Sequence, residues 1–293
     1  MTAIRIVLLV VVCALSLPLK AEPGLGDEAY GLLKSMYAYD ATFPLNVRTA
    51  GRFEREGAQF ERLVFESFHG GNATGLLGLP AGEGPFPIVI LMHGVTGSKS
   101  QWLDDAFTNG GLVSAGLLAK GYAVLALDAQ YHGDRAVYND YIDVGEMVFQ
   151  RGWGVRYANL LTQTVVDYRR AIDYLATRED IDVTRLGALG YSMGGHMAFI
   201  LGALEPRIQA TVACVVPHMA GMPMTPYAFA RDMGADPLLM LMGTQDRFYT
   251  REQAQALFDL VPGDNKTLHF YDSGHSLPAE YTDKAVNWLS EQL

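Results

Sequence analysis

Residues 185–199 read RLGALGYSMGGHMAF, in which an apolar run is followed by a glycine-rich turn and then by a second apolar run. The run from Leu186 to Leu189 predicts a buried strand, and the run from His196 to Leu204 predicts a helix. A sharp strand–turn–helix connection would place Ser192 at its apex and lift the serine hydroxyl clear of a sheet. A bare Gly-x-Ser-x-Gly also arises by chance in a glycine-rich chain, so the alternative interpretation is a turn with an idle serine. The choice between a catalytic and an idle serine depends on whether suitable partner residues for Ser192 occur elsewhere in the chain.

The rest of the chain alternates between two apolar patterns. Continuous apolar runs predict strands buried on both faces of a sheet. Such runs occupy residues 88–94, 122–128, 185–191, 208–216 and 237–243, and a shorter last strand is expected at residues 268–272. Helical spacing occupies residues 27–40, 100–120, 155–177, 251–260 and 278–293. An antiparallel hairpin is expected from residues 59–68 and 73–79. This alternation predicts an α/β fold with a mostly parallel sheet and helices on both faces.

Length and composition favour one globular domain. The chain has 293 residues, of which 49% are hydrophobic and 18% charged, a balance that supports a large core. No internal repeat or linker divides the sequence, so residues 22–293 are expected to form a single domain. The sequence has no long insertion that would form a large lid domain, so none is expected.

The N-terminus has the pattern of an export signal. Arg5 supplies positive charge, the stretch from Ile6 to Leu17 is nearly all apolar, Pro18 ends it, and Ala21 is a small residue suited to cleavage. About 12 apolar residues are short for a membrane span, which needs roughly 20. Residues 1–21 are therefore predicted to be a signal peptide, and the protein to be periplasmic or secreted with no stable membrane span after cleavage. An uncleaved membrane anchor is the alternative.

Cysteine content and charge limit the function classes further. Removal of residues 1–21 would leave Cys214 as the only cysteine, so no disulfide could form within the chain. The formal net charge of −10 offers no electrostatic support for nucleic-acid binding. The oligomeric state stays open at this stage.

Two further side chains follow strand ends in a pattern that fits Ser192. A serine hydroxyl needs a base to take its proton, and the base needs an orienting acid. Asp246 comes just after the strand at 237–243, and His275 just after the last strand. We therefore predict Ser192 as nucleophile, His275 as base and Asp246 as the acid that orients it. Asp272 and Asp264 are competitors for the acid role.

A tetrahedral intermediate also needs donors for its oxyanion. The backbone N–H of Met193, which opens the helix after Ser192, is one candidate. The loop His93-Gly94-Val95-Thr-Gly follows the strand at 88–94 and offers the N–H of Val95 as the second, with His93 bracing the loop. An ordinary strand-end turn is the alternative.

Other residues are expected to border the pocket. They are His93, Gly94, Tyr131 and His218. The stretches 129–154 and 217–236 are the candidates to shape an acyl pocket. The loop from Asp128 to His132 could suggest a metal site, but its scattered ligands favour a structural hydrogen-bonding loop. No metal and no cofactor are predicted.

Together these motifs resemble a known family. Gly-Tyr-Ser192-Met-Gly-Gly, His93-Gly-Val-Thr-Gly, the Asp128…His132-Gly loop, Gly-Thr-Gln-Asp246 and Ser-Gly-His275 look like the α/β-hydrolase superfamily, in its dienelactone-hydrolase and acetyl-esterase-like branch. The resemblance covers roughly residues 59–293. It implies an eight-stranded, mostly parallel sheet and a serine-hydrolase mechanism without a cofactor. Dienelactone hydrolases proper use a cysteine nucleophile, so the serine here favours simple esters over lactones.

The leading interpretation is a serine carboxylesterase that acts on small-molecule esters with short acyl chains. A peptidase or amidase of the prolyl-oligopeptidase type, a thioesterase and a lipase are the alternatives within enzymes. A non-enzymatic binding module on the same fold is the alternative from another class, and the intact serine, aspartate and histidine argue against it.

Overall fold

The computed structural model describes residues 25–219, 222, 224–234 and 236–293. The predicted signal peptide, residues 1–21, lies outside them, as do four residues of the stretch 217–236. No helix in the described part of the chain combines the length and apolarity needed to cross a membrane.

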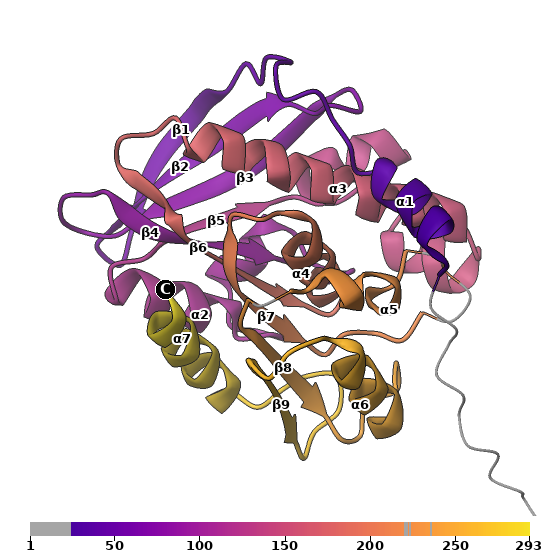
Figure 1. Ribbon diagram of the computed structural model, residues 1–293. Helices are drawn as coiled ribbons and strands as arrows, with labels where there is room; N and C mark the ends of the chain where they lie inside the picture. The colour runs from indigo at the N-terminus through magenta and orange to yellow at the C-terminus, as the bar shows by residue number, and fades with distance from the viewer. Residues whose placement is uncertain (1–24, 220–221, 223, 235) are drawn as a thin grey trace, which may run out of the picture.

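One nine-stranded sheet forms the centre of the molecule (Figure 1). The strands are β1 (Arg48–Arg55), β2 (Ala58–Glu66), β3 (Asn72–Leu79), β4 (Phe86–Met92), β5 (Ala123–Leu127), β6 (Ile181–Tyr191), β7 (Ile208–Cys214), β8 (Leu238–Gly243) and β9 (Lys266–Tyr271). Their order is β1-β2-β3-β5-β4-β6-β7-β8-β9. The pairs from β1 to β5 along this order are antiparallel, and all pairs from β5 to β9 are parallel. The mostly parallel sheet predicted from the sequence is confirmed.

Helices connect the strands. The α-helices are α1 (Asp27–Ser35), α2 (Gly110–Ala119), α3 (Gly154–Leu175), α4 (Met193–Leu204), α5 (Pro226–Phe229), α6 (Arg251–Leu260) and α7 (Glu280–Gln292). Shorter helical segments are η1 (Lys99–Leu103), η2 (Gly133–Asn139), η3 (Glu146–Gln150) and η4 (Ala230–Asp232). The described residues form no separate lid domain.

Strand β4 shows how the sheet is covered on both faces. Because successive strand side chains point to opposite faces, Ile88, Ile90 and Met92 join one core cluster and Val89 and Leu91 join another. The first cluster contains α3 and most of the apolar residues of α4, and the second contains α2 and α7. Helices therefore lie on both faces of the sheet, which is why its central strands are apolar throughout.

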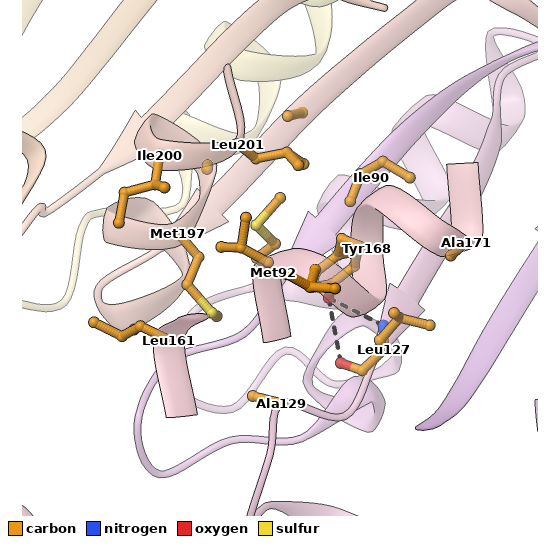
Figure 2. Close-up of a cluster of buried hydrophobic side chains, with 14 of the residues drawn as sticks. Ile90, Met92, Leu127, Ala129, Leu161, Tyr168, Ala171, Met197, Ile200 and Leu201 are labelled. Atoms are coloured by element: carbon orange, nitrogen blue, oxygen red, sulfur yellow. Dashed lines mark hydrogen bonds between the residues drawn. The ribbon is translucent and has the colours of Figure 1, made fainter. Parts of the chain in front are cut away.

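A buried tyrosine links the first cluster to the sheet backbone (Figure 2). The hydroxyl of Tyr168 on α3 donates to the carbonyl of Leu91 at 2.9 Å and accepts from the N–H of Leu127 at 3.1 Å. The ends of β4 and β5 are thereby tied to α3, close to the loops that follow both strands.

Two expectations differ from the structure. The sheet has nine strands rather than the eight that the resemblance implied, because the polar edge strand β1 pairs with β2. The single helix predicted over 100–120 is wrong, since η1 and α2 are separate. Asn109 has a left-handed φ of 52°, and the carboxylate of Asp105 accepts the N–H of Leu112 at 2.8 Å, so a new helix starts there.

Candidate active site

Ser192 lies in a strained turn between β6 and α4. Its φ of 58° and ψ of −116° are rarely adopted by L residues. A Cβ on Gly190 would overlap the carbonyl of Gly194, and a Cβ on Gly194 would overlap the carbonyl of Met92. Glycine at both positions lets strand and helix approach closely enough to hold the serine at the carboxyl edge of the sheet.

Three side chains predicted to act together lie in one hydrogen-bonded chain. The Nε2 atom of His275 is 2.7 Å from the Oγ of Ser192. The Nδ1 atom of the same ring is 2.6 Å from the Oδ2 of Asp246. The Asp246 carboxylate is fully buried, whereas the His275 side chain is 16% exposed. In this arrangement the histidine donates from Nδ1 to the carboxylate and offers Nε2 as an acceptor to the serine hydroxyl.

The competing aspartates lie elsewhere. The Oδ1 of Asp272 accepts from the Nε2 of Gln245 at 2.7 Å and from the hydroxyl of Thr244 at 3.2 Å. Asp264 is exposed in the turn before β9. The structure therefore brings Asp246, and neither competitor, to His275.

Two aromatic residues that the sequence analysis missed hold the histidine loop. The hydroxyl of Tyr191 donates to the carbonyl of His275 at 2.9 Å and accepts from the N–H of Leu277 at 2.8 Å. The ring of Phe248 packs edge-on against the His275 ring, with centroids 4.6 Å apart, and its N–H donates to the Oδ1 of Asp246 at 2.9 Å. Tyr191 stands directly before Ser192 in the chain, which is the only sequence signal for its role.

Two histidines hold the carbonyl groups of the loop after β4. The Nε2 of His93 accepts from the N–H of Ala129 at 2.9 Å, so the ring proton is on Nδ1 and donates to the carbonyl of Gly94 at 2.7 Å. The Nε2 of His132 is 2.8 Å from the carbonyl of Val95. Because the C=O and N–H of a trans peptide point in opposite directions, these contacts turn the N–H of Val95 away from His93.

Gln101 is a further contact to this loop that sequence reasoning did not identify. Its Oε1 accepts from the N–H of Gly94 at 3.0 Å. A Cβ on Gly97 would collide with the same amide, so glycine is required there for Gln101 to enter the loop. The Gly94 N–H is thus occupied, which leaves the next N–H, that of Val95, as the candidate donor on this loop. Met193 follows Ser192 as the first residue of α4, where backbone N–H groups have no partner within the helix.

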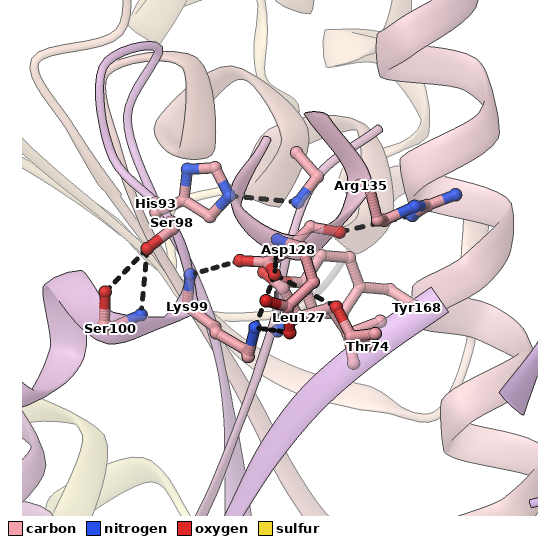
Figure 3. Close-up of polar contacts among 11 residues, drawn as sticks. Thr74, His93, Ser98, Lys99, Ser100, Leu127, Asp128, Arg135 and Tyr168 are labelled. Atoms are coloured by element: carbon pink, nitrogen blue, oxygen red, sulfur yellow. Dashed lines mark hydrogen bonds and ion pairs between the residues drawn. The ribbon is translucent and has the colours of Figure 1, made fainter. Parts of the chain in front are cut away.

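The loop after β5 is held by a buried ion pair (Figure 3). The Nζ of Lys99 is 2.5 Å from the Oδ2 of Asp128, whose carboxylate also accepts from the N–H of Lys99, the hydroxyl of Thr74 and the N–H of Asp134. Burial alone would raise the pKa of Asp128, but the Lys99 ammonium and these donors hold it below the ordinary value. This is the structural hydrogen-bonding role that was predicted for the loop. The described residues contain no group of three or more His, Cys, Asp or Glu side chains suited to hold a metal ion.

A cavity of about 240 Å³ opens beside Ser192 and His275. Both stretches expected to shape the pocket contribute to it, the first through Gly145, Val148 and Phe149 and the second through Pro217 and Met219. The other residues that line it are Gly94, Val95, Thr96, Gln101, Phe107, Thr108, Tyr157, Tyr191, Met193, Arg247 and Phe248.

Only one of the four residues expected to border the pocket lines this cavity, namely Gly94. His93 is fully buried and acts beneath the loop. The ring of Tyr131 is covered by the guanidinium of Arg156, 5.1 Å from its centroid. His218 packs edge-on against Tyr227 with ring centroids 5.3 Å apart. The expectation is corrected for these three residues, because proximity to a strand end does not determine which way a side chain points.

Comparisons with known proteins show the family to which the chain belongs. The profile of the dienelactone hydrolase family matches residues 73–288, and the chain belongs to that family. YtaP of Bacillus subtilis (strain 168), which is named a hydrolase, is 30% identical over 181 residues, covering 58% of this chain and 56% of that protein. Esterase FrsA of Klebsiella pneumoniae subsp. pneumoniae is 28% identical over 204 residues, covering 67% of this chain and 43% of that protein. The chain thus spans about half the length of these curated relatives.

A solved structure supports the fold. A cold-adapted esterase from an Arctic intertidal metagenomic library superposes with a TM-score of 0.69 at 22% sequence identity, covering 86% of this chain and all of that chain. At this identity the likeness concerns the fold, which is the α/β-hydrolase fold expected from the sequence.

Proposed function

We propose that this protein is a serine carboxylesterase. The observation that carries the proposal is the hydrogen-bonded chain from Ser192 through His275 to Asp246 at the edge of a cavity. In the proposed reaction the Oγ of Ser192 attacks the ester carbonyl carbon and its proton passes to the Nε2 of His275. The imidazolium formed is stabilised by Asp246 and returns that proton to the departing alcohol.

Hydrolysis of the acyl-enzyme completes the cycle. Water enters where the alcohol left, gives a proton to His275 and attacks the acyl carbon, and the carboxylic acid is released as Ser192 regains its proton. The N–H groups of Val95 and Met193 are the proposed donors to the oxyanion in both tetrahedral intermediates. Removing one such donor typically costs about 3 kcal/mol of transition-state stabilisation.

The cavity supports a preference for short acyl chains. Its volume of about 240 Å³ is below the roughly 300–1,000 Å³ of pockets that hold drug-sized ligands. Val148, Phe149, Tyr157 and Met219 present a mostly apolar wall to it. A small acyl group would bury its carbon atoms against this wall, whereas a long chain would extend beyond it.

A substrate panel tests the proposal. We expect p-nitrophenyl acetate and butyrate to be hydrolysed faster than the decanoate, and peptide p-nitroanilides to be left intact, with all activity lost in Ser192→Ala. A fluorophosphonate probe should label the wild type and not that variant. Cleavage of p-nitroanilides would favour a peptidase, and a maximum at long acyl chains a lipase. Absence of both labelling and hydrolysis would refute a serine hydrolase.

We further propose that residues 1–21 direct export of the protein. Arg5, the apolar run and Ala21 support this. N-terminal sequencing of protein recovered from the culture medium or the periplasm should begin near residue 22, and recovery only of the full-length chain would contradict cleavage.

A further inference from the structure

The cavity beside Ser192 does not end at the catalytic residues. A second, shallower cavity of about 680 Å³ shares Thr96, Gln101, Phe107 and Thr108 with it. A third cavity of about 500 Å³ shares Arg55 and Leu103 with the second. Neighbouring cavities thus share lining residues, and we call this row of three cavities the extended groove. It runs from Ser192 past η1 to the turn between β1 and β2.

The end of the extended groove beside Ser192 and its middle differ in polarity. The wall beside Ser192 includes Val148, Phe149 and Met219. The middle of the extended groove presents Ser98, Ser100 and the carboxylate of Asp104. A site with an apolar end and a polar end suits a molecule that is itself apolar at one end and polar at the other.

The far end adds polar groups of both signs. Arg55, Glu56 and Asp105 line the third cavity. Trp102 also lines it, is 2% exposed, and its indole N–H has no hydrogen-bond partner among the described residues. The indole nitrogen is itself covered, so the exposed side chains of Arg55, Glu56 and Asp105 are the polar groups of this end that a ligand can reach.

Resting on the proposed esterase function, we infer that the natural substrate is a short-chain ester of an oligosaccharide, whose sugar units occupy the extended groove while the acyl group enters the apolar cavity. Hydroxyl groups of the sugar units can exchange hydrogen bonds with serine hydroxyls, carboxylates and a guanidinium without any net charge of their own. The charged side chains of the groove beyond Ser192 are one arginine and three carboxylates among the described residues, so an anionic chain is disfavoured.

A peptide is the less suitable occupant. Extended peptides gain affinity by adding a strand to a free sheet edge, and β1 is an edge of this sheet. The groove meets only Arg55 of β1, at the turn, and does not run along that edge. An acylated peptide would therefore lose the main-chain hydrogen bonds that usually hold it.

The test compares esters that differ only in the alcohol. We expect kcat/KM to rise by about tenfold or more from mono-O-acetylglucose to mono-O-acetylcellotetraose, because binding energy from remote units stabilises the transition state. Ser100 is exposed in the middle of the groove, so Ser100→Trp should remove this rise while leaving p-nitrophenyl acetate hydrolysis unchanged. Ser35→Trp, on the exposed end of α1 and away from the groove, is the matched control and should retain the rise. Arg55→Ala should reduce only the values for the longer sugars.

Equal kcat/KM across the sugar series in the wild type would overturn the inference, as would a rise that survives Ser100→Trp. A length dependence seen with O-acetylserine peptides and not with sugars would assign the groove to peptides instead. Each of these outcomes leaves p-nitrophenyl acetate hydrolysed. Loss of that hydrolysis in the wild type would refute the esterase function itself, so the two failures are distinguishable.

Discussion

Ser192 occupies a backbone conformation that costs of order 1–3 kcal/mol, and the surrounding structure holds it there. Its N–H donates to the carbonyl of Cys214 on β7 at 2.9 Å, and its carbonyl accepts from the N–H of His196 at 3.0 Å. The hydroxyl is thereby presented to His275, which is 83 positions away in the chain. At the scale of the residue, the proposed reaction depends on individual atoms of Ser192 and His275 that are held within hydrogen-bonding distance.

The acid role can be assigned by one pair of substitutions. Asp246→Asn keeps the volume of the side chain but cannot stabilise the imidazolium, and we expect kcat to fall by on the order of 10³ to 10⁴ with the thermal unfolding midpoint little changed. Asp272→Asn is the matched control, because Asp272 contacts Gln245 and Thr244, and it should retain activity. Steady-state kinetics of both variants measure this. The opposite ranking would move the acid role to Asp272.

Gln101 offers a test of the loop after β4. In Gln101→Met the acceptor for the Gly94 N–H is lost, so the loop can rotate and misplace the N–H of Val95. We expect kcat to fall by about 10- to 100-fold with KM little changed, since the proposed contact to the oxyanion would form only in the transition state. Gln209→Met, an exposed position on β7, serves as the control. A rise in KM alone would show that Gln101 contributes to substrate binding rather than to the loop.

The crossing of β6 and α4 determines the site at the scale of elements. Gly190 and Gly194 allow the strand and helix to meet, and β4 lies directly beside them. The parallel strands β4, β6, β8 and β9 end at the same edge of the sheet, so the residues that follow them converge there. The positions of the loops that carry Asp246 and His275 relative to Ser192 follow from this convergence.

A single methyl group should disrupt that crossing. Gly194→Ala would place a Cβ against the carbonyl of Met92, which belongs to a buried strand and cannot move aside. We expect a loss of more than about 3 kcal/mol in the free energy of unfolding, measured by urea titration. Gly31→Ala on α1 is the control, because its Cβ would meet nothing within 4 Å and alanine favours the helix. Equal stability of the two variants would contradict the close crossing.

At the scale of the whole molecule, buried histidines make the free energy of unfolding depend on pH. Burial lowers the pKa of His93, His132 and His196 below the ordinary value near 6.5, that of His196 to about 4. Below pH 6.5 the unfolded chain takes up protons at these positions and the folded chain does not. The unfolded state is therefore favoured as the pH falls, and stability is retained above that pH.

The expected loss is measurable. His196, whose pKa is lowered to about 4, should by itself cost about 2 kcal/mol of unfolding free energy at pH 5 relative to pH 7.5. Urea titrations at the two pH values should show a loss of at least this size, and His196→Gln should reduce the loss by about 2 kcal/mol. An unchanged pH dependence in that variant would mean that His196 does not contribute.

The sequence predicted most of the sheet because its parallel strands are apolar on both faces. It missed β1, whose side chains are largely exposed and carry no continuous apolar pattern. The helix predicted over residues 100–120 wrongly merged η1 and α2. The break between them depends on the left-handed backbone of Asn109 and on the hydrogen bond of the Asp105 carboxylate, and apolar spacing reveals neither.

The sequence by itself determined the alternation of the parallel strands with helices, the glycine positions of the turn at Ser192, and the candidates Asp246 and His275, since all of these depend on spacing along the chain. Only the tertiary structure decided that Asp246 and not Asp272 meets His275, that Gln101 holds Gly94, and that the cavity beside Ser192 adjoins a second cavity lined by Arg55. Those features depend on distances and directions between side chains far apart in sequence, which packing sets and spacing does not.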